Sequence, residues 1–283
     1  MQLTANGVRL EVEDHGSPHG EPLLLVMGLG MQRLGWHEDL VLLLVARGFR
    51  VIRFDNRDIG LSQSFDQGGV PNLALDSLRY AFGFRVKSPY TLEDMAADAV
   101  GVLDALGIAA AHVCGASMGG MIAQRMAAGA PARVKSLTLM MTSSGARRLP
   151  GPTLKVRSAM IARPKSQTVE GIVEHYVRLY ALIGSPAYPS APAYLRDRFT
   201  TSVNRSYRPA GTARQMVAIA ADGDRSPVLG SIRMPTRIIH GGADPLVPIA
   251  AAQIDVIDGM GHDLPAPLYP RFVDGIAAAA GRA

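Results

Sequence analysis

Short apolar runs alternate with longer amphipathic stretches along the first half of the chain, which indicates strands alternating with helices. We expect strands at 8–13, 23–27, 49–54, 111–114 and 134–141. We expect helices near 38–47, from Thr91 to around Leu106, and at 118–128. Thr91 and Asp94 have the spacing of a capping box, and Gly107 is a suitable helix stop. This rhythm predicts an α/β fold with a mostly parallel central sheet flanked by helices.

The strand rhythm stops between 142 and 233. This segment holds helical stretches such as 169–182 and 195–203, separated by Pro and Gly. Strands return at 236–240 and 254–257. We therefore predict one α/β core built from 1–141 and 234–283, and an inserted helical cap, or lid, built from 142–233.

The most informative motif is Gly115-Ala116-Ser117-Met118-Gly119-Gly120, which lies between an apolar strand and a helix rich in Ala and Met. A sharp strand-to-helix turn needs residues without bulk on both sides of the serine, and Gly115 and Gly119 supply them. The Ser117 hydroxyl is then exposed above the sheet, at a helix N-terminus that favours developing negative charge. The pattern indicates a nucleophile elbow, with a Gly-rich surface turn as the plain alternative.

An acid and a base follow in the chain, each just after a predicted strand. Asp244 follows the strand at 236–240, and His262 follows the strand at 254–257. A serine hydroxyl is a weak nucleophile until an imidazole takes its proton, and a carboxylate holds that imidazole in the correct tautomer. We predict that Ser117 is the nucleophile, that His262 is the general base and then acid, and that Asp244 orients His262. Taken singly, a solvated loop histidine and a turn aspartate are the plainer interpretations.

A Gly-rich loop follows the apolar strand at 23–27. Its residues Gly28-Leu29-Gly30 can turn a backbone N–H toward a developing oxyanion. The residue after the nucleophile supplies the second donor in elbows of this type. We predict that the backbone N–H groups of Leu29 and Met118 form the oxyanion hole, with an ordinary β-turn as the alternative for the loop.

Together these motifs resemble the α/β-hydrolase superfamily over nearly the whole chain, and within it the bacterial carboxylesterase branch that includes aclacinomycin methylesterase. The matching segments are Val26-Met27-Gly28, Gly35-Trp36, 53–62, 95–100, the elbow and Gly259-Met260-Gly261-His262. The resemblance implies an α/β-hydrolase fold and hydrolysis of a small or medium carboxylic ester through an acyl-enzyme, with no metal and no organic cofactor. Many relatives carry histidine where this chain has Met27, but a backbone donor does not need that side chain. The same resemblance implies that Asp55, Arg57 and Asp58 are structural residues.

Other functions stay open at this stage. On the same triad the chain could hydrolyse a lactone or a carbon–carbon bond, or use peroxide in place of water. Ser117 in the elbow disfavours the chemistry of aspartate-nucleophile dehalogenases and epoxide hydrolases. A non-catalytic ligand binder and an interaction protein that uses a basic cap are alternatives of other classes. Candidates for the substrate pocket, or simply for the apolar faces that hold the cap, are Met160, Ile161, Tyr176, Leu179, Tyr180, Leu182 and Ile183.

Composition agrees with a globular enzyme. The 283 residues are 48% apolar and 19% charged, and no apolar run approaches the ~20 residues that span a bilayer. The first residues do not read as a secretion signal, so we expect a cytoplasmic protein. The single cysteine, Cys114, cannot form an internal disulfide and is expected to be a small core residue. No metal-binding spacing and no phosphate loop is apparent. The expected partner, a small-molecule ester, is what the resemblance to the α/β-hydrolases implies.

The net charge of +5 is unevenly distributed. Residues 146–233 carry 14 Lys or Arg against 5 Asp or Glu, a net +9, and the remainder carries 15 against 19, a net −4. A basic cap can attract an anionic substrate, although a solvated helical surface explains it as well. Nucleic acid is not an expected partner because the basic residues belong to no known binding module.

The connection between the acid and the base is short. Only residues 241–253 separate His240 from Ile254, which is barely enough for a crossover between parallel strands. Residues 248–252 could form about one helical turn. We therefore expect the last strands to be partly uncovered, and to be covered by a partner in a homo-oligomer or by rearranged segments of the chain.

Overall fold

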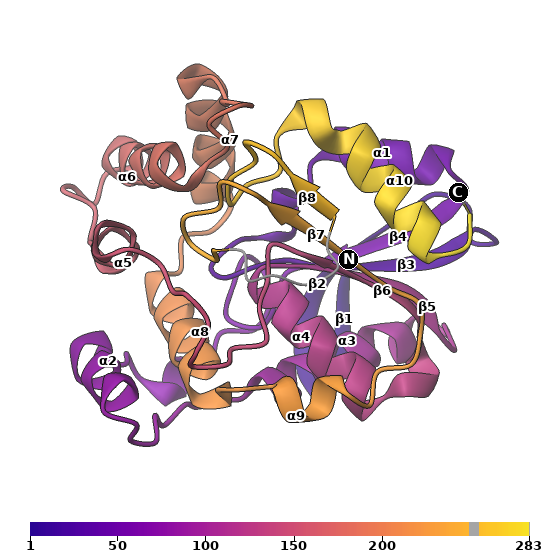
Figure 1. The fold of residues 1–283 in the computed structure, drawn as a ribbon, viewed down its shortest axis with the longest axis horizontal. Helices are drawn as coiled ribbons and strands as arrows, with labels where there is room; N and C mark the ends of the chain where they lie inside the picture. The colour runs from indigo at the N-terminus through magenta and orange to yellow at the C-terminus, as the bar shows by residue number, and fades with distance from the viewer. Residues whose placement is uncertain (249–254, 283) are drawn as a thin grey trace.

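The computed structural model describes residues 1–248 and 255–282, and eight strands of these residues form one sheet (Figure 1). The strand order is β1-β2-β4-β3-β5-β6-β7-β8. Strands β1 and β2, and β2 and β4, pair antiparallel, and every later pair is parallel. The strands are β1 Gln2–Ala5, β2 Val8–His15, β3 Glu21–Val26, β4 Phe49–Phe54, β5 Ala111–Ala116, β6 Val134–Met140, β7 Thr236–Gly241 and β8 Asp255–Ile257.

The sheet is covered on both faces because side chains alternate along each strand. In β3, Leu24 and Val26 belong to a core with α3 (Leu92–Ala105) and α4 (Met118–Gly129). Leu23 and Leu25 belong to the opposite core, with α1 (Glu38–Ala46) and α10 (Tyr269–Ala279). Cys114 lies fully buried in this second core, as expected of a small core residue. Parallel strands with two buried faces explain the continuous apolar runs of the sequence.

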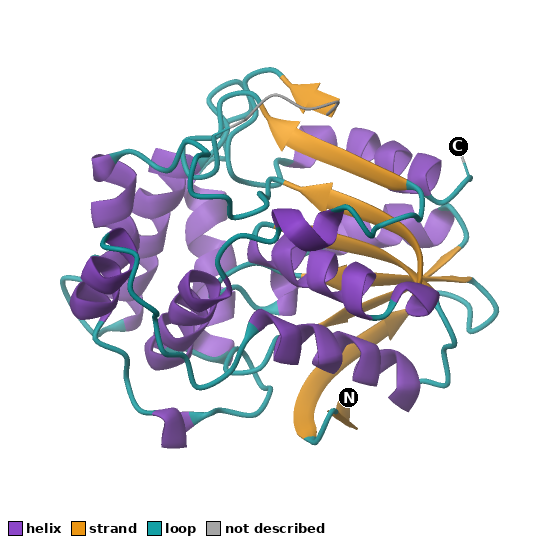
Figure 2. Ribbon diagram, turned by 60° about the horizontal axis from the view of Figure 1, so that its bottom comes forward, coloured by secondary structure: helices purple, strands orange, loops and turns teal. Residues whose placement is uncertain are grey.

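Further helices lie beyond the carboxyl ends of the parallel strands. Figure 2 shows the strand arrows pointing toward this group, which Figure 1 labels. Its members are α2 Leu73–Ala81, α5 Leu154–Ile161, α6 Val169–Ile183, α7 Pro192–Arg205 and α8 Pro209–Asp222. The short helix α9 (Ser226–Leu229) contacts α4 instead. The carboxyl edge of the sheet, where ligands bind in open α/β folds, therefore faces a helical layer.

The expected mostly parallel sheet flanked by helices is present, and most element bounds agree to within two residues. The capping box forms, because Thr91 Oγ1 accepts from the Asp94 N–H and the Asp94 carboxylate accepts from the Thr91 N–H. Strand β1 and helices α2 and α10 were not among the expected elements. The helical turn expected within 248–252 and the start of the strand expected at 254–257 fall on residues 249–254, outside the described residues. Within the described ranges, no helix is both long and apolar enough to cross a membrane.

Candidate active site

Ser117 lies in a strained turn between β5 and α4. Its φ of 54° and ψ of −120° fall in a region that residues other than glycine rarely adopt. Holding a residue in this conformation costs about 1 to 3 kcal/mol. Two hydrogen bonds hold the turn: the Ser117 N–H donates to Met140 O at 2.9 Å, and Thr142 Oγ1 donates to Ser117 O at 2.8 Å. The end of β6 thus fixes the position of Ser117.

The two glycines of the elbow are required by close packing. A Cβ on Gly115 would lie 2.2 Å from Gly119 O, and a Cβ on Gly119 would lie 2.0 Å from Val26 O. Neither position tolerates a side chain without movement of the backbone. The spacing noticed in the sequence therefore reflects contact of the elbow with itself and with β3.

Ser117, His262 and Asp244 meet in one hydrogen-bonded line. His262 Nε2 lies 2.9 Å from Ser117 Oγ, and His262 Nδ1 lies 2.7 Å from Asp244 Oδ2. The His262 backbone N–H donates to Ile183 O at 2.7 Å, so the end of α6 holds the loop that carries the ring. Nδ1 must carry the proton toward the carboxylate, which leaves Nε2 free to accept the proton of Ser117.

The Asp244 side chain is fully buried and has a partner on each oxygen. Oδ1 accepts the backbone N–H groups of Leu246 and Val247, both at 2.9 Å, and Oδ2 faces His262. His240, at the end of β7, has its Nε2 2.7 Å from Val247 O and 3.8 Å from Asp244 Oδ2. A tight turn braced by His240 therefore sets the direction of the carboxylate.

Of the two backbone donors predicted for an oxyanion, Met118 follows Ser117 in the chain and Leu29 lies in the loop after β3. A Cβ on Gly28 of that loop would lie 3.2 Å from Ser117 Cβ, so the loop contacts Ser117. Met118 is the first residue of α4, where helix N–H groups have no partner within the helix. Across 1–248 and 255–282, neither the Leu29 nor the Met118 N–H is hydrogen-bonded to an acceptor of the protein. Both donors are therefore free to bind an oxygen of a ligand.

Residues 21–256 match the protein family described as the alpha/beta hydrolase fold. The chain belongs to the α/β-hydrolase family. It is similar to rhodomycin D methylesterase DnrP of Streptomyces peucetius, with 27% identity over 98% of this chain and 96% of that protein. It is 26% identical to 3-oxoadipate enol-lactonase 1 of Acinetobacter baylyi, over 88% of this chain and 81% of that protein. The family resemblance read from the sequence motifs is confirmed.

A solved structure supports the fold independently. The meta-cleavage product hydrolase CumD of Pseudomonas fluorescens IP01 superposes with a TM-score of 0.75 at 20% identity, over 99% of this chain and 97% of that chain. At this identity the likeness concerns the fold alone. The α/β-hydrolase fold class is confirmed.

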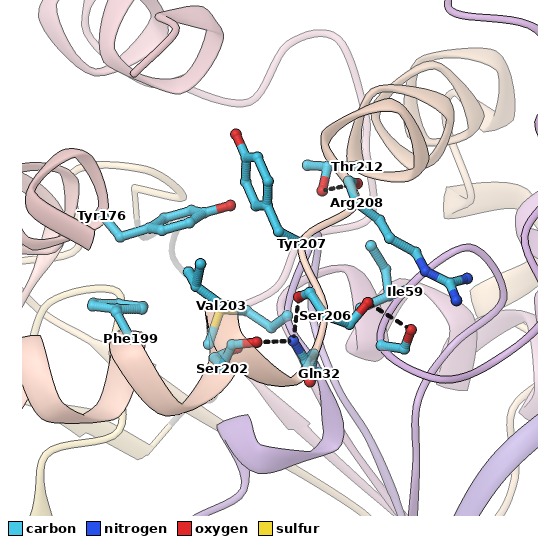
Figure 3. Close-up of a pocket in the computed structure, with 13 residues that line it drawn as sticks. Gln32, Ile59, Tyr176, Phe199, Ser202, Val203, Ser206, Tyr207, Arg208 and Thr212 are labelled. Atoms are coloured by element: carbon cyan, nitrogen blue, oxygen red, sulfur yellow. Dashed lines mark hydrogen bonds between the residues drawn. The ribbon is translucent and has the colours of Figure 1, made fainter. Parts of the chain in front are cut away.

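One cavity of this α/β-hydrolase adjoins the loop that carries Leu29. Its volume is about 30 Å³, and Gly30 and Met31 form part of its wall. Figure 3 shows the rings of Tyr176, Phe199 and Tyr207 on one side of it. Gln32 forms the floor with hydrogen bonds from Nε2 to Ser202 O at 2.7 Å and to Ser206 O at 2.8 Å.

A second cavity of about 210 Å³ adjoins the segment after His262. Its walls include Asp263 and Leu264 from this segment, and Tyr180 and Arg198 from α6 and α7. Burial raises the pKa of Asp263, and a hydrogen bond from the Ser185 hydroxyl opposes that rise. Of the seven apolar residues considered for a substrate pocket, Tyr176 and Tyr180 line these two cavities and the other five line neither.

The loop after β4 is held by buried ion pairs that reach α8. Asp58 accepts from Arg214 Nε at 2.8 Å and from Arg214 Nη2 at 2.7 Å, and from the Tyr90 hydroxyl at 2.8 Å. Arg57 pairs with Asp98 through two bonds of 2.7 Å. The hydrogen bond to Asp58 raises the pKa of Arg214. Asp55 accepts the Arg33 N–H at 2.7 Å. All three residues of this loop thus have structural contacts, whereas no signal in the sequence pointed to Arg214.

Replacing Arg214 with methionine is expected to lower the free energy of unfolding by about 3 to 5 kcal/mol, because Asp58 remains buried without its counter-charge. Arg196→Met is the matched control, since Arg196 pairs with Glu174 on the surface, where ion pairs add little to stability, and its loss of unfolding free energy should be much smaller. Urea unfolding of both variants measures the difference. Equal losses in the two variants would contradict a special role for the buried pair.

Proposed function

We propose that this α/β-hydrolase is a serine carboxylesterase that acts on a small or medium ester through an acyl-enzyme. The observation that carries the proposal is the continuous hydrogen-bonded line from Asp244 through His262 to Ser117, beside two backbone donors, Leu29 and Met118, that have no acceptor among the residues the structure describes. A ligand binder has no need of this arrangement. The similarity to a rhodomycin D methylesterase supports an ester as the substrate.

In the first half of the proposed reaction, Ser117 Oγ attacks the ester carbonyl carbon while His262 Nε2 takes the Oγ proton. The carbonyl oxygen becomes an oxyanion, which the N–H groups of Leu29 and Met118 bind. When the intermediate collapses, the bond to the alcohol oxygen breaks and His262 gives its proton to that oxygen. The alcohol leaves, and the acyl group stays on Ser117.

In the second half, a water molecule attacks the acyl carbon and His262 takes one of its protons. Collapse of the second tetrahedral intermediate breaks the bond to Ser117 Oγ, which receives the proton back. A carboxylic acid leaves. Asp244 remains ionised throughout and stabilises the imidazolium form of His262 in both halves.

We also propose that residues 1–141 and 234–283 are the catalytic core and that 142–233 are a cap. Helices α5 to α8 lie beyond the carboxyl edge that carries Ser117, and residues of α6, α7 and α8 line the cavity beside Gly30. The substrate would then bind between the core and these helices. The cytoplasmic location and a homo-oligomer that covers the last strands stay predictions from the sequence.

Hydrolysis of a p-nitrophenyl ester series tests the proposal. We expect acetyl and butyryl esters to give a kcat/KM at least about tenfold above long acyl esters, because the cavity beside the Leu29 loop is small, about 30 Å³, and an acyl chain that outgrows its pocket loses transition-state binding. An aromatic methyl ester and a five-membered lactone are tested beside them. Turnover of the lactone alone would overturn the carboxylesterase assignment and support the lactonase alternative that the enol-lactonase relative suggests.

A further inference from the structure

We propose that Gln215 of α8 is a positioning residue for the oxyanion hole, an inference that rests on the proposed ester hydrolysis. Gln215 is fully buried, although glutamine is mostly an exposed residue. Its Oε1 accepts the Gly30 N–H at 2.9 Å, and its Nε2 donates to Arg57 O at 3.0 Å. Only one orientation of the amide satisfies both partners, because Gly30 N–H can only donate and Arg57 O can only accept.

Gly30 lies in the turn that presents the Leu29 N–H. The Met31 N–H donates to Gly28 O at 3.3 Å, and Gly30, the third residue of this turn, has a φ of 67°. A positive φ at this position is the mark of a type II turn. Type I and type II turns differ by rotation of the central peptide, here the one between Leu29 and Gly30, and glycine allows both. The bond from Gly30 N–H to Gln215 Oε1 selects the observed rotation.

A second side chain holds the other end of the same turn. Asn56 is buried, and its Nδ2 donates to Met27 O at 2.8 Å. The peptide that carries the Leu29 N–H is therefore flanked by two peptides that are each fixed by a buried amide side chain. Asn56 comes from the loop after β4, whereas Gln215 comes from α8. Helix α8 thus contributes one of the two restraints on the oxyanion donor.

The packing of α8 agrees with this role. A Cβ on Gly30 would lie 2.8 Å from Thr212 Cγ2, and Thr212 is one turn before Gln215 on the same helix face. A Cβ on Gly211 would lie 2.2 Å from Asp58 O. Helix α8 therefore contacts both loops that Gln215 joins. A larger residue at Gly30 or Gly211 would force the helix away from these loops.

The test compares Gln215→Met with Gln124→Met. Gln124 is also buried and also joins two segments, with Nε2 3.2 Å from Ser143 O and Oε1 2.8 Å from Arg225 Nε, but it does not contact the 28–31 turn. We expect Gln215→Met to lower kcat for p-nitrophenyl acetate by roughly ten- to a hundredfold with KM within about threefold, because misplaced catalytic donors cost rate rather than binding. We expect Gln124→Met to change kcat by less than about threefold. A similar kcat in both variants would overturn the inference.

The affinity for a trifluoromethyl ketone is a second measurement. It would stay unchanged if Gln215 served only the stability of the fold. This inhibitor forms a tetrahedral adduct with a serine, so its binding depends on the oxyanion donors. Its affinity should fall in Gln215→Met by the same factor as kcat/KM, while the affinity for the acetate product stays the same. An unchanged inhibitor affinity would overturn the inference.

Gln215→Glu is a second test variant, to be used if Gln215→Met fails to fold. A protonated glutamic acid matches the amide of glutamine, with a carbonyl oxygen for the Gly30 N–H and an O–H for Arg57 O. Burial raises the pKa of such a carboxyl group, and ionisation then removes the donor to Arg57 O. The kcat of Gln215→Glu relative to the wild type should therefore rise as the pH is lowered from 8 to 6. A ratio that is constant with pH would contradict the role of the amide.

Backbone amide exchange separates failure of this inference from failure of the proposed function. Wild-type turnover that is absent, or that survives Ser117→Ala, would refute the esterase proposal. The exchange of the Gly30 N–H does not depend on turnover, and we expect it to be at least about tenfold faster in Gln215→Met, while the amides of Leu24 and Leu25 in β3 stay protected. Equal Gly30 exchange in the two proteins would refute the positioning role by itself.

Discussion

Ser117→Ala is expected to lower kcat for ester hydrolysis by about a millionfold, the loss seen when the nucleophile of a triad is removed. Alanine fits the elbow, because the strain at this position lies in the backbone and the replacement removes only Oγ. His262 and Asp244 would keep their 2.7 Å hydrogen bond, but no atom would remain to form the acyl-enzyme. Steady-state hydrolysis of p-nitrophenyl acetate, together with mass spectrometry of an acyl adduct, measures the effect.

The chain offers a matched control for this substitution. Ser136 in β6 is buried, and its Oγ lies 2.8 Å from His112 Nδ1, so it too is a serine beside a histidine. This second pair lies between β5 and β6, away from the carboxyl edge of the sheet. Ser136→Ala should leave kcat within about threefold of the wild type. Comparable losses in both variants, or an acyl adduct on Ser117→Ala, would contradict Ser117 as the nucleophile.

The geometry of the elbow, and the meeting of Ser117, Asp244 and His262, were predictable because their physical causes are local. Gly115 and Gly119 are fixed by contacts of the turn with its own helix and with β3, so the requirement appears as a short sequence motif. Asp244 and His262 follow strands, and parallel strands bring their carboxyl ends to one edge. Hydrophobic periodicity predicts the strands, and the arrangement of the strands brings Ser117, Asp244 and His262 together.

Other parts of the site depend on contacts between residues far apart in the sequence, which no local sequence pattern reveals. Gln215 reaches Gly30 across 185 positions of the chain, and Arg214 reaches Asp58 across 156. In the sequence both residues belong to an ordinary amphipathic helix, with nothing to distinguish a buried Gln or Arg from a solvated one. The sizes of the two cavities depend on the packing of α6 and α7 in the same way.

The short connection between the acid and the base bears on the geometry of the site. Strand β7 ends at Gly241, β8 begins at Asp255, and the two are paired in parallel. Asp244 reaches His262 because it lies in a tight turn directly after β7, so its position needs only Leu246 and Val247 of the connection. The length of the segment up to 254 therefore does not set the distance between Asp244 and His262.

This turn also determines what Asp244→Asn would do. The oxygen of the new amide must accept the N–H groups of Leu246 and Val247, because an NH₂ group there would face two donors. The NH₂ group is then directed at His262 Nδ1. To accept that hydrogen bond, Nδ1 must lose its proton, and the proton moves to Nε2. His262 is thereby held in the tautomer that cannot accept the proton of Ser117.

We therefore expect Asp244→Asn to lower kcat by about ten thousandfold, with a folded protein and nearly unchanged KM. Asp224→Asn is the matched control, since Asp224 Oδ1 accepts the Ser226 N–H at 2.8 Å in an exposed turn of the same kind and should tolerate the change. The kcat of both variants, and the ¹⁵N shifts of the His262 ring that report its tautomer, measure the effect. A fully active Asp244→Asn, or a His262 ring still protonated on Nδ1, would show that another group orients the base.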